Sequence, residues 1–333
     1  MPKTYLVTGG IGFLGSGLVR SLLQAGHSVR VLDDQSRGSA SRLDDIAGQF
    51  EFVGADIRDA EAVQQAMQGV DGVCHLAFIN GTEFFYTKPD LVLDVGVRGM
   101  LNVVDACLKH DVGELILVSS SEVYQTPPTV PTDETVPLSV PDPLNPRYSY
   151  GAGKIFSEVI AINYGRFHFE RVVICRPHNV YGPQMGWEHV VPQFVLRMAE
   201  LAQRNPSGPV PFPIQGSGRE TRSFVYIDDF TDGLMRLVEK GEHLGIYHVG
   251  TMEELSIAEV AQAVGEYFVR HVEIVPGPAA AGGTPRRCPD IKKIAALGYA
   301  PRYSFREGLA LTAKWYVEHA AQAPRSDRTL AST

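Results

Sequence analysis

The chain has 333 residues, of which 44% are hydrophobic, and carries a formal net charge of −8. This length exceeds that of a typical domain with one hydrophobic core and predicts two lobes. The negative net charge disfavours nucleic acid as a partner, because nucleic-acid binders present a basic face. No apolar run approaches the ~18 residues that cross a membrane, no signal peptide precedes the first predicted strand, and none of the four cysteines lies in a C-x-x-C pair. We therefore expect a reduced, cytoplasmic protein that uses neither a membrane nor a metal site.

Short apolar strands alternate with helical patterns through the first half of the chain. Strands are predicted at Tyr5–Thr8, Ser28–Asp33, Phe50–Gly54, Gly72–Leu76, Glu114–Ser119 and Arg171–Arg176, and helices at Gly12–Ala25, Ala60–Met67, Val97–His110 and Gly151–Phe167. This alternation predicts right-handed βαβ units and a parallel sheet covered by helices on both faces. We expect an α/β fold of the Rossmann type, a doubly wound parallel sheet, over residues 1–183.

The texture of the sequence changes after Pro183, where proline and glycine become frequent. Helices are predicted at Val191–Arg204, Asp228–Lys240, Ser256–Tyr267 and Phe305–Glu318, and short strands at Phe224–Ile227 and Ile246–Val249. These elements predict a smaller α/β substrate-binding lobe over residues 184–320. It is expected to be interleaved with the first lobe, which receives strands near 224–250. The polar tail, 322–333, is expected to be disordered.

A glycine-rich segment, Thr8–Gly15, follows the first predicted strand and opens a helix. It fits G-x-G-x-x-G through Gly10, Gly12 and Gly15, and a further glycine stands at position 9. Such a turn lets the backbone touch a pyrophosphate, and the helix N-terminus supplies N–H donors. The context of strand, turn and helix predicts a dinucleotide site rather than an empty glycine turn.

Asp33 ends the second strand, 18 residues after Gly15. A carboxylate there accepts hydrogen bonds from the adenosine ribose hydroxyls and repels a 2′-phosphate, which favours NAD over NADP, although nearby Arg37 could serve NADP. Asp56 could meet the adenine or could cap a helix. The predicted cofactor contacts are Gly9, Gly12, Phe13, Leu14, Asp33, Asp56, Ile57, Leu76, Ala77, Tyr150, Lys154 and Pro177.

Tyr150 and Lys154 stand at positions i and i+4, which share one face of a helix. A phenol has a pKa near ~10 and is a poor base at neutral pH, but a neighbouring cation and the positive nicotinamide favour phenolate. Phenolate can then take a proton from a hydroxyl as hydride leaves the same carbon. Ser120 follows the fifth strand, where it faces the ligand crevice of such a sheet and could hydrogen-bond the reacting oxygen; its alternative is a turn-forming role.

These motifs together resemble the extended short-chain dehydrogenases/reductases of the NAD-dependent nucleotide-sugar epimerase/dehydratase family. The resemblance runs from residue 4 to about residue 320 and includes 8–15, 75–77, 119–124, 150–154, 176–183, 216–229 and 286–290. It implies Ser120, Tyr150 and Lys154 as the catalytic set, a nucleotide-diphospho-sugar as substrate, and a homodimer paired through helices 97–110 and 151–167. It implies substrate contacts from Asn179, Arg222 and Arg287. Ser121, Val191 and His178 are further candidate substrate residues.

Two residues of this set have open roles. His178 could supply a proton near neutral pH or could be a buried structural histidine. Glu122 bears on the reaction, because simple 4-epimerases in the family tend to carry a small residue there, whereas dehydratases and nucleotide-glucuronate decarboxylases tend to carry Glu. A carboxylate could remove the C5 proton or only bind a hydroxyl. The aromatic stretch 78–86 is expected to line the sugar pocket, or merely to pack.

The leading hypothesis is 4-epimerisation through a transient 4-keto sugar with tightly bound NAD, because it needs only the catalytic set. Dehydration or decarboxylation with Glu122 as the base is the alternative. Against dehydration, Ser121 replaces the acid that usually precedes this Glu, so no donor for a leaving hydroxyl is evident. A regulator that senses NAD without catalysis is disfavoured, because the pair of Tyr150 and Lys154 is intact.

Overall fold

The computed structural model describes residues 1–279 and 282–324. Within these residues, one parallel sheet of seven strands has the order β11-β6-β5-β4-β1-β2-β3. The strands are β1 (Thr4–Thr8), β2 (Ser28–Asp33), β3 (Glu51–Gly54), β4 (Gly72–His75), β5 (Glu114–Val118), β6 (Arg171–Pro177) and β11 (Gly245–Val249). The predicted Rossmann-type sheet is confirmed, and the chain returns from beyond residue 240 to supply its last strand beside β6.

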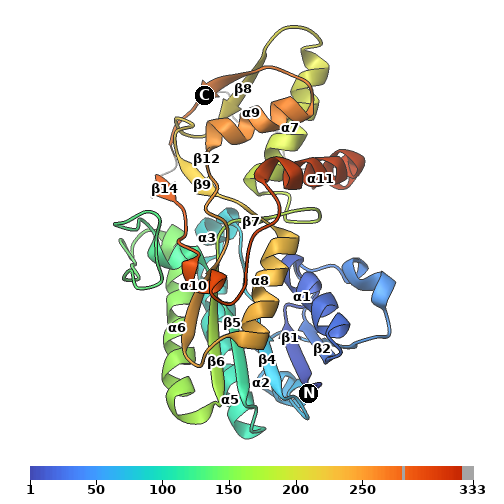
Figure 1. The fold of residues 1–333 in the computed structure, drawn as a ribbon, viewed down its shortest axis with the longest axis vertical. Coiled ribbons are helices and arrows are strands. Elements are labelled where there is room, and N and C mark those ends of the chain that lie inside the picture. Colours follow the sequence, from blue (N-terminus) through green and yellow to red (C-terminus); the bar gives the residue numbers. More distant parts are fainter. Residues whose placement is uncertain (280–281, 325–333) are drawn as a thin grey trace.

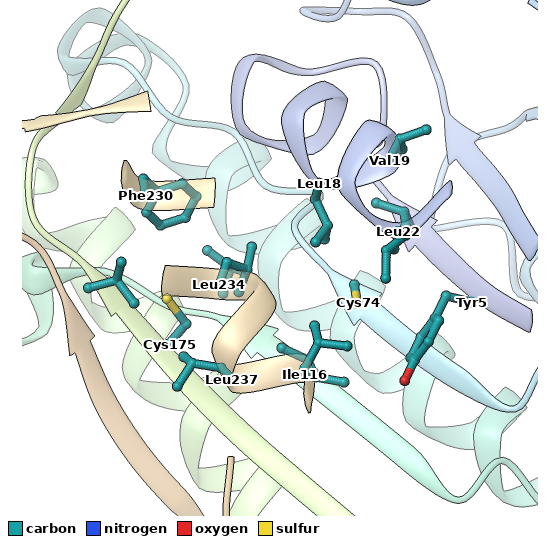
Figure 2. Close-up of a cluster of buried hydrophobic side chains, with 14 of the residues drawn as sticks. Tyr5, Leu18, Val19, Leu22, Cys74, Ile116, Cys175, Phe230, Leu234 and Leu237 are labelled. Carbon is teal, nitrogen blue, oxygen red and sulfur yellow. The ribbon is translucent and has the colours of Figure 1, made fainter. Parts of the chain in front are cut away.

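Helices cover both faces of the sheet, as Figure 1 shows. One face carries α1 (Phe13–Gln24) and α8 (Ile227–Lys240), and the other carries α2 (Ala60–Ala66), α5 (Gly99–Lys109) and α6 (Ser149–His168). Figure 2 shows Leu18 and Leu22 of α1 and Leu234 of α8 meeting strand residues such as Ile116. The neighbours of Ile116, Leu115 and Leu117, point to the opposite core, because side chains alternate along a strand.

The helical stretch before α5 is longer than predicted. Helix was expected from Val97, but α3 (Thr82–Thr87) and α4 (Pro89–Leu93) come first, and a π-helical turn, η2 (Asp94–Arg98), joins α4 to α5. Pro89 stands in the first turn of α4, where its fixed φ and missing N–H favour a helix start. The π turn inserts a residue and shifts the apolar register, so the periodicity is visible only after it.

The smaller lobe lies above the carboxyl end of the sheet in Figure 1. Its core is formed by α7 (Val190–Arg204), α9 (Ile257–Tyr267) and α11 (Phe305–Glu318) with the paired strands β8 (Val210–Ile214) and β13 (Val272–Pro276). Trp187 and Trp315 pack against this core and form an aromatic cluster with Tyr316. The ring centroids of the two tryptophans are 5.7 Å apart. A three-stranded sheet contains β9 (Thr221–Ser223), β12 (Glu254–Ser256) and β14 (Arg286–Arg287).

One predicted strand pairs elsewhere than expected. The segment near residue 224 was expected to return to the main sheet, but β10 (Val225–Tyr226) pairs with β7 (Val180–Tyr181) in a separate two-stranded sheet. The short helices are η1 (Ala40–Ile46), η3 (Ser121–Tyr124), η4 (Pro146–Tyr148), α10 (Lys292–Ala295) and η5 (Ala320–Gln322). From residue 325 onward, the tail predicted to be disordered lies outside the described residues. Among the helices that are described, none is both long and apolar enough to span a membrane.

Candidate active site

A cavity of about 550 Å³ lies at the carboxyl ends of the strands and has walls from both lobes. The sheet order reverses between β1 and β4, and ligands of doubly wound sheets bind outside the strand ends at such a switch point. Nearly all residues singled out from the sequence line this cavity: Gly9, Gly12, Phe13, Leu14, Asp33, Asp56, Ile57, Leu76, Ala77, Ser120, Ser121, Glu122, Tyr150, Lys154, Pro177, Asn179, Val191 and Arg287.

The glycine turn leaves its backbone open to a ligand. Gly9 has a φ of +71°, and its carbonyl accepts a hydrogen bond from the N–H of Gly12 at 3.1 Å. A Cβ on Gly15 would lie 2.1 Å from the oxygen of Gly9, so a side chain would break the turn. The first turn of α1, which the structure describes in full, has no acidic residue and no side-chain cap. Its N–H groups can therefore face an anion, which fits a pyrophosphate.

Asp33 is held at the end of the cavity beside this turn. Its carboxylate accepts hydrogen bonds from the N–H groups of Ile11 at 3.3 Å and Gln35 at 2.8 Å. Burial raises the pKa of Asp33, and these two N–H groups act in the opposite direction. Arg37, the residue that could have served NADP, instead pairs with Glu188 and lies 4.8 Å from the Phe84 ring centroid. The arrangement fits the ribose of NAD.

Asp56 also lines the cavity, but its carboxylate is engaged with its neighbour. Arg58 binds it at 2.6 Å, and this hydrogen bond lowers the pKa of Asp56. The helix-capping alternative considered for Asp56 belongs instead to Asp59, whose side chain accepts hydrogen bonds from the first turn of α2. Asp56 therefore has no capping function that would explain its place in the cavity wall.

Three side chains with the chemistry of a proton-transfer set, Ser120, Tyr150 and Lys154, meet in the cavity wall. Burial raises the pKa of the Tyr150 phenol, while a hydrogen bond with Ser120 lowers it. Lys154 is 3% exposed and donates a hydrogen bond to the carbonyl of Val118 at 2.8 Å. Burial lowers the pKa of the Lys154 ammonium to about 7, against the raising effect of Glu158. The set can hold and move one proton beside a reacting hydroxyl.

Glu122 forms an ion pair inside the cavity. Its Oε1 accepts a hydrogen bond from Arg287 at 2.6 Å, and the two side chains are 25% and 4% exposed. Burial alone would raise the pKa of Glu122, but the charges of Arg287, Arg147 and Arg222 outweigh it and hold the pKa below its ordinary value. Glu122 is therefore an anion among cations and a poor base in this state.

Two predicted substrate residues do not line the cavity. His178 is fully buried, and among the described residues neither of its ring nitrogens has a hydrogen-bond partner. Burial, with smaller effects from His248 and Arg287, lowers its pKa well below the ordinary value, so it cannot supply a proton near neutral pH. Arg222 stands behind the wall and donates to the carbonyl of Thr221 at 2.7 Å. Burial lowers its pKa to about 10, so it stays cationic.

Arg147 lines the cavity and was missed from the sequence. It follows a proline-rich loop without periodicity, and its Nε donates to the carbonyl of Gly282 at 3.1 Å, 135 residues away. No local pattern signals such a contact. Phe78 and Phe85 of the stretch 78–86 also line the cavity, whereas Phe84 stands outside its wall.

A buried polar network adjoins the candidate catalytic set. Glu158 accepts two hydrogen bonds from Arg176, at 2.9 and 2.6 Å, and one from Ser119 at 2.5 Å. Arg176 also donates to the hydroxyl of Tyr124, which bonds His248 at 2.7 Å. The network anchors α6 to β5 and β6. In the part of the chain that is described, no group of three His, Cys, Asp or Glu side chains could hold a metal.

The sequence of the chain matches the model of the NAD dependent epimerase/dehydratase family over residues 5–250. It is 34% identical to UDP-glucuronic acid decarboxylase 6 of Arabidopsis thaliana over 312 residues, which span 92% of this chain and 86% of that protein. It is 32% identical to dTDP-glucose 4,6-dehydratase of Streptomyces antibioticus over 326 residues, 95% of this chain and 93% of that protein.

Solved structures with the same fold come from the same group of enzymes. The UDP-glucose 4-epimerase of Thermus thermophilus, in complex with NAD, superposes with a TM-score of 0.82 at 29% identity, over 94% of this chain and 99% of that one. A dTDP-glucose 4,6-dehydratase of Streptomyces venezuelae with NAD bound superposes with a TM-score of 0.83 at 30% identity, over 96% and 98%. The chain therefore belongs to the NAD-dependent epimerase/dehydratase family, and NAD is its cofactor.

Proposed function

We propose that the enzyme oxidises C4 of a nucleotide-diphospho-sugar and then removes C6 of a glucuronate as carbon dioxide. Tyr150 takes the proton of the C4 hydroxyl, Ser120 hydrogen-bonds the same oxygen, and Lys154 stabilises the phenolate. NAD, when bound, would supply the hydride acceptor for C4 and the hydride donor once C6 has left. The glycine turn and Asp33 would hold the cofactor, and residues 184–320 would supply substrate contacts from Val191 and Arg287, which line the cavity.

The observation that carries decarboxylation is the ion pair of Glu122 and Arg287 in the cavity that also contains Tyr150. A 4-keto sugar with a C6 carboxylate is a β-keto acid, which loses carbon dioxide without a base. The electrons of the C5–C6 bond pass into an enolate, and C5 then needs a proton. Similarity to UDP-glucuronic acid decarboxylases supports this assignment.

We propose that the substrate carboxylate displaces Glu122 from Arg287. Glu122 would then lose the cation that holds its pKa down and could bind a proton. It would deliver this proton to C5, so its role is that of an acid rather than a base. Dehydration fits less well, because it needs a base at C5 while Arg287 keeps Glu122 a poor one, and Ser121 supplies no acid at C6.

The second candidate is 4-epimerisation, the leading hypothesis from the sequence. The charges of the site favour it. The three positive charges of Arg147, Arg222 and Arg287 are balanced by the negative charges of Glu122 and a doubly charged diphosphate. No further positive charge from this set is then available to pair with a sugar carboxylate. It also needs only Ser120, Tyr150 and Lys154. Similarity to structures of UDP-glucose 4-epimerases supports it.

Product analysis separates the candidates. The enzyme is incubated with UDP- and dTDP-linked glucose and glucuronic acid in deuterated water, and the products are examined by mass spectrometry and NMR. Decarboxylation predicts a pentose that has lost carbon dioxide and carries one deuterium at C5. Epimerisation predicts an isomer of unchanged composition without deuterium on carbon, and that result with untouched glucuronate would overturn the proposal.

Glu122→Gln tests the proposed acid. The amide cannot deliver a proton, so the variant should release carbon dioxide once and then stall with reduced cofactor on the enzyme, seen as a lasting absorbance of NADH. Ser121→Ala is the matched control, because it changes the neighbouring cavity residue without removing an acid. Full turnover of glucuronate by Glu122→Gln would remove Glu122 from the mechanism.

We also propose that the enzyme is a homodimer. Phe156, Val159 and Phe167 stand on one face of α6 at helical spacing and are 57%, 49% and 81% exposed, and Leu101 of the adjacent α5 is 37% exposed. An apolar face of this kind on two packed helices favours association with a second copy.

A further inference from the structure

The ring of Phe78 contacts both side chains of the i, i+4 pair on α6. Phe78 follows the end of β4 by three residues, at the carboxyl end of the sheet. Its ring centroid is 5.2 Å from that of Tyr150, edge to face at 85°. Lys154 Nζ lies 4.1 Å from the same Phe78 centroid. One aromatic ring therefore touches both the phenol and the ammonium of the proposed catalytic set.

Two glycines make the space that this ring occupies. A Cβ on Gly96 would lie 2.3 Å from Cζ of Phe78, and a Cβ on Gly153 would lie 3.0 Å from the same atom. Gly96 belongs to the π-helical turn Asp94–Arg98, and such turns often occur at functional sites. Gly153 lies on α6 directly before Lys154. The backbone on both sides is shaped around the ring and holds it against its two partners.

The contact matters because the ammonium is weakly held. Lys154 is 3% exposed, and the hydrogen bond to Val118 satisfies one of its three donors. Its charged form is disfavoured by burial near neutral pH. An aromatic face attracts a cation, and the attraction is strongest where water is excluded. The Phe78 ring therefore favours the charged form of Lys154 and fixes its position relative to Tyr150.

We propose that Phe78 is a positioning residue of this active site, which holds the Lys154 ammonium beside the Tyr150 phenol through its π face, and that Gly96 is required to admit its ring. The inference rests on the proposed catalytic set but not on which reaction follows oxidation at C4. It assigns a role to the π turn, which the C4 chemistry itself does not explain.

The first test reads the charge of Lys154 directly. Lysine labelled with ¹³C at Cε is incorporated into the NAD-bound enzyme, and Lys154, one of eight lysines, is assigned from the spectrum of Lys154→Arg. Phe78→Leu keeps an apolar side chain and removes the π face, so the pKa of Lys154 should fall by about one pH unit. Phe84→Leu removes a ring from the same segment without contact to Lys154 and should leave this titration unchanged.

The other groups that face Lys154 stay constant in this comparison. They lie on three elements and are Tyr150 and Glu158 on α6, Cys175 on β6 and His75 on β4. None is altered by Phe78→Leu. A shift in the titration therefore belongs to the ring.

The second test uses catalysis and a double-mutant cycle. The first reduction of bound NAD by substrate, followed by absorbance, should be about tenfold slower in Phe78→Leu. Because a weaker cation raises the pH at which phenolate forms, the acidic limb of the rate profile should move to higher pH. Gly96→Ala pushes the ring away and should have a similar effect, and the double variant should be no slower than Phe78→Leu alone.

An unchanged Lys154 titration in Phe78→Leu overturns the proposal, even if the first reduction of NAD becomes slower, because the ring would then only fill space. Additive losses in the double variant overturn the role of Gly96. Phe78→Met serves if the leucine variant does not fold. If none of the nucleotide-sugars tested causes the wild-type enzyme to reduce its bound NAD, the proposed function is wrong. The titration of Lys154 would still test the role of Phe78.

Discussion

Burial works against the chemistry of Tyr150. A buried phenol resists ionisation, and the pKa of Tyr150 is raised by burial, so phenolate must be favoured by nearby positive charge. In the proposed mechanism that charge would come from Lys154 and, when NAD is bound, from the nicotinamide. We therefore expect the phenolate to form more readily in the NAD-bound enzyme than in the empty one, where it would be a less compensated buried anion.

Tyr150→Phe should strongly reduce turnover and leave the cofactor bound. The substitution removes one oxygen and keeps the ring, which Phe85 stacks at a centroid distance of 4.9 Å. General acid–base groups contribute ~10²–10⁴-fold to a rate, and kcat should fall by this factor. The Kd of NAD, measured by calorimetry, should change little; near-normal kcat would show that the phenol is not the base.

Loss of Glu158 should destabilise the whole fold. Its ion pair with Arg176 is almost fully buried, with side chains 1% and 3% exposed, and Glu158→Ala would leave the guanidinium buried without a counter-charge. We expect a loss of about 3–5 kcal/mol in the free energy of unfolding, measured in urea.

The matched control is the exposed pair of Arg306 and Glu266, with side chains 61% and 57% exposed. Glu266→Ala should cost about 1 kcal/mol or less. Equal effects of the two substitutions would mean that the buried network carries no special stability.

The positions of single residues could be predicted from the sequence where a motif lies next to the strand and helix that it requires. Gly15 and Asp33 could be placed in one cavity because strand, turn and helix are local features. The position of His178 could not be predicted, because a motif beside a strand end does not determine the direction in which a side chain points. Arg147 could not either, because its position depends on a carbonyl far along the chain.

At the scale of elements, the turn before α1 depends on the absence of side chains. Gly15→Ala would place a Cβ 2.1 Å from the oxygen of Gly9, so the turn must open and its N–H groups would lose their alignment. We expect the Kd for NAD to rise at least about tenfold, which corresponds to about 1.4 kcal/mol. Gly54→Ala, where the nearest atom lies 3.5 Å away, is the control and should bind NAD normally; equal affinity in both variants would refute this account.

The element predictions failed where register or pairing is not local. The helix that contains α5 was predicted to begin at Val97, and the helical residues ahead of it were missed, because the π turn offsets the apolar positions on its two sides. The strand near residue 224 has the composition of a sheet strand, but its partner is β7 rather than β11 or β6. Period and composition identify an element, whereas its neighbour is decided by the path of the chain.

At the scale of the whole molecule, the apolar face of α5 and α6 predicts the oligomeric state. Phe156→Glu places a charge in the middle of the proposed interface, where burying it without a partner is costly. Light scattering should give the mass of a dimer for the wild type and of a monomer for the variant. Leu311→Glu, at another exposed apolar position, on α11, should remain dimeric, and a monomeric wild type at micromolar concentration would contradict the proposal.

The position of the two tryptophans gives the molecule an optical property. The chain has two tryptophans, and both belong to the cluster around Tyr316, whose hydroxyl donates to the carbonyl of Met185 at 2.5 Å. Met185 lines the cavity. All indole fluorescence therefore originates beside this cavity, and reduced nicotinamide absorbs light at the wavelengths that indole emits. The tryptophan fluorescence of the unlabelled protein should therefore decrease when the cofactor is reduced by the sugar and recover when the cofactor is oxidised again.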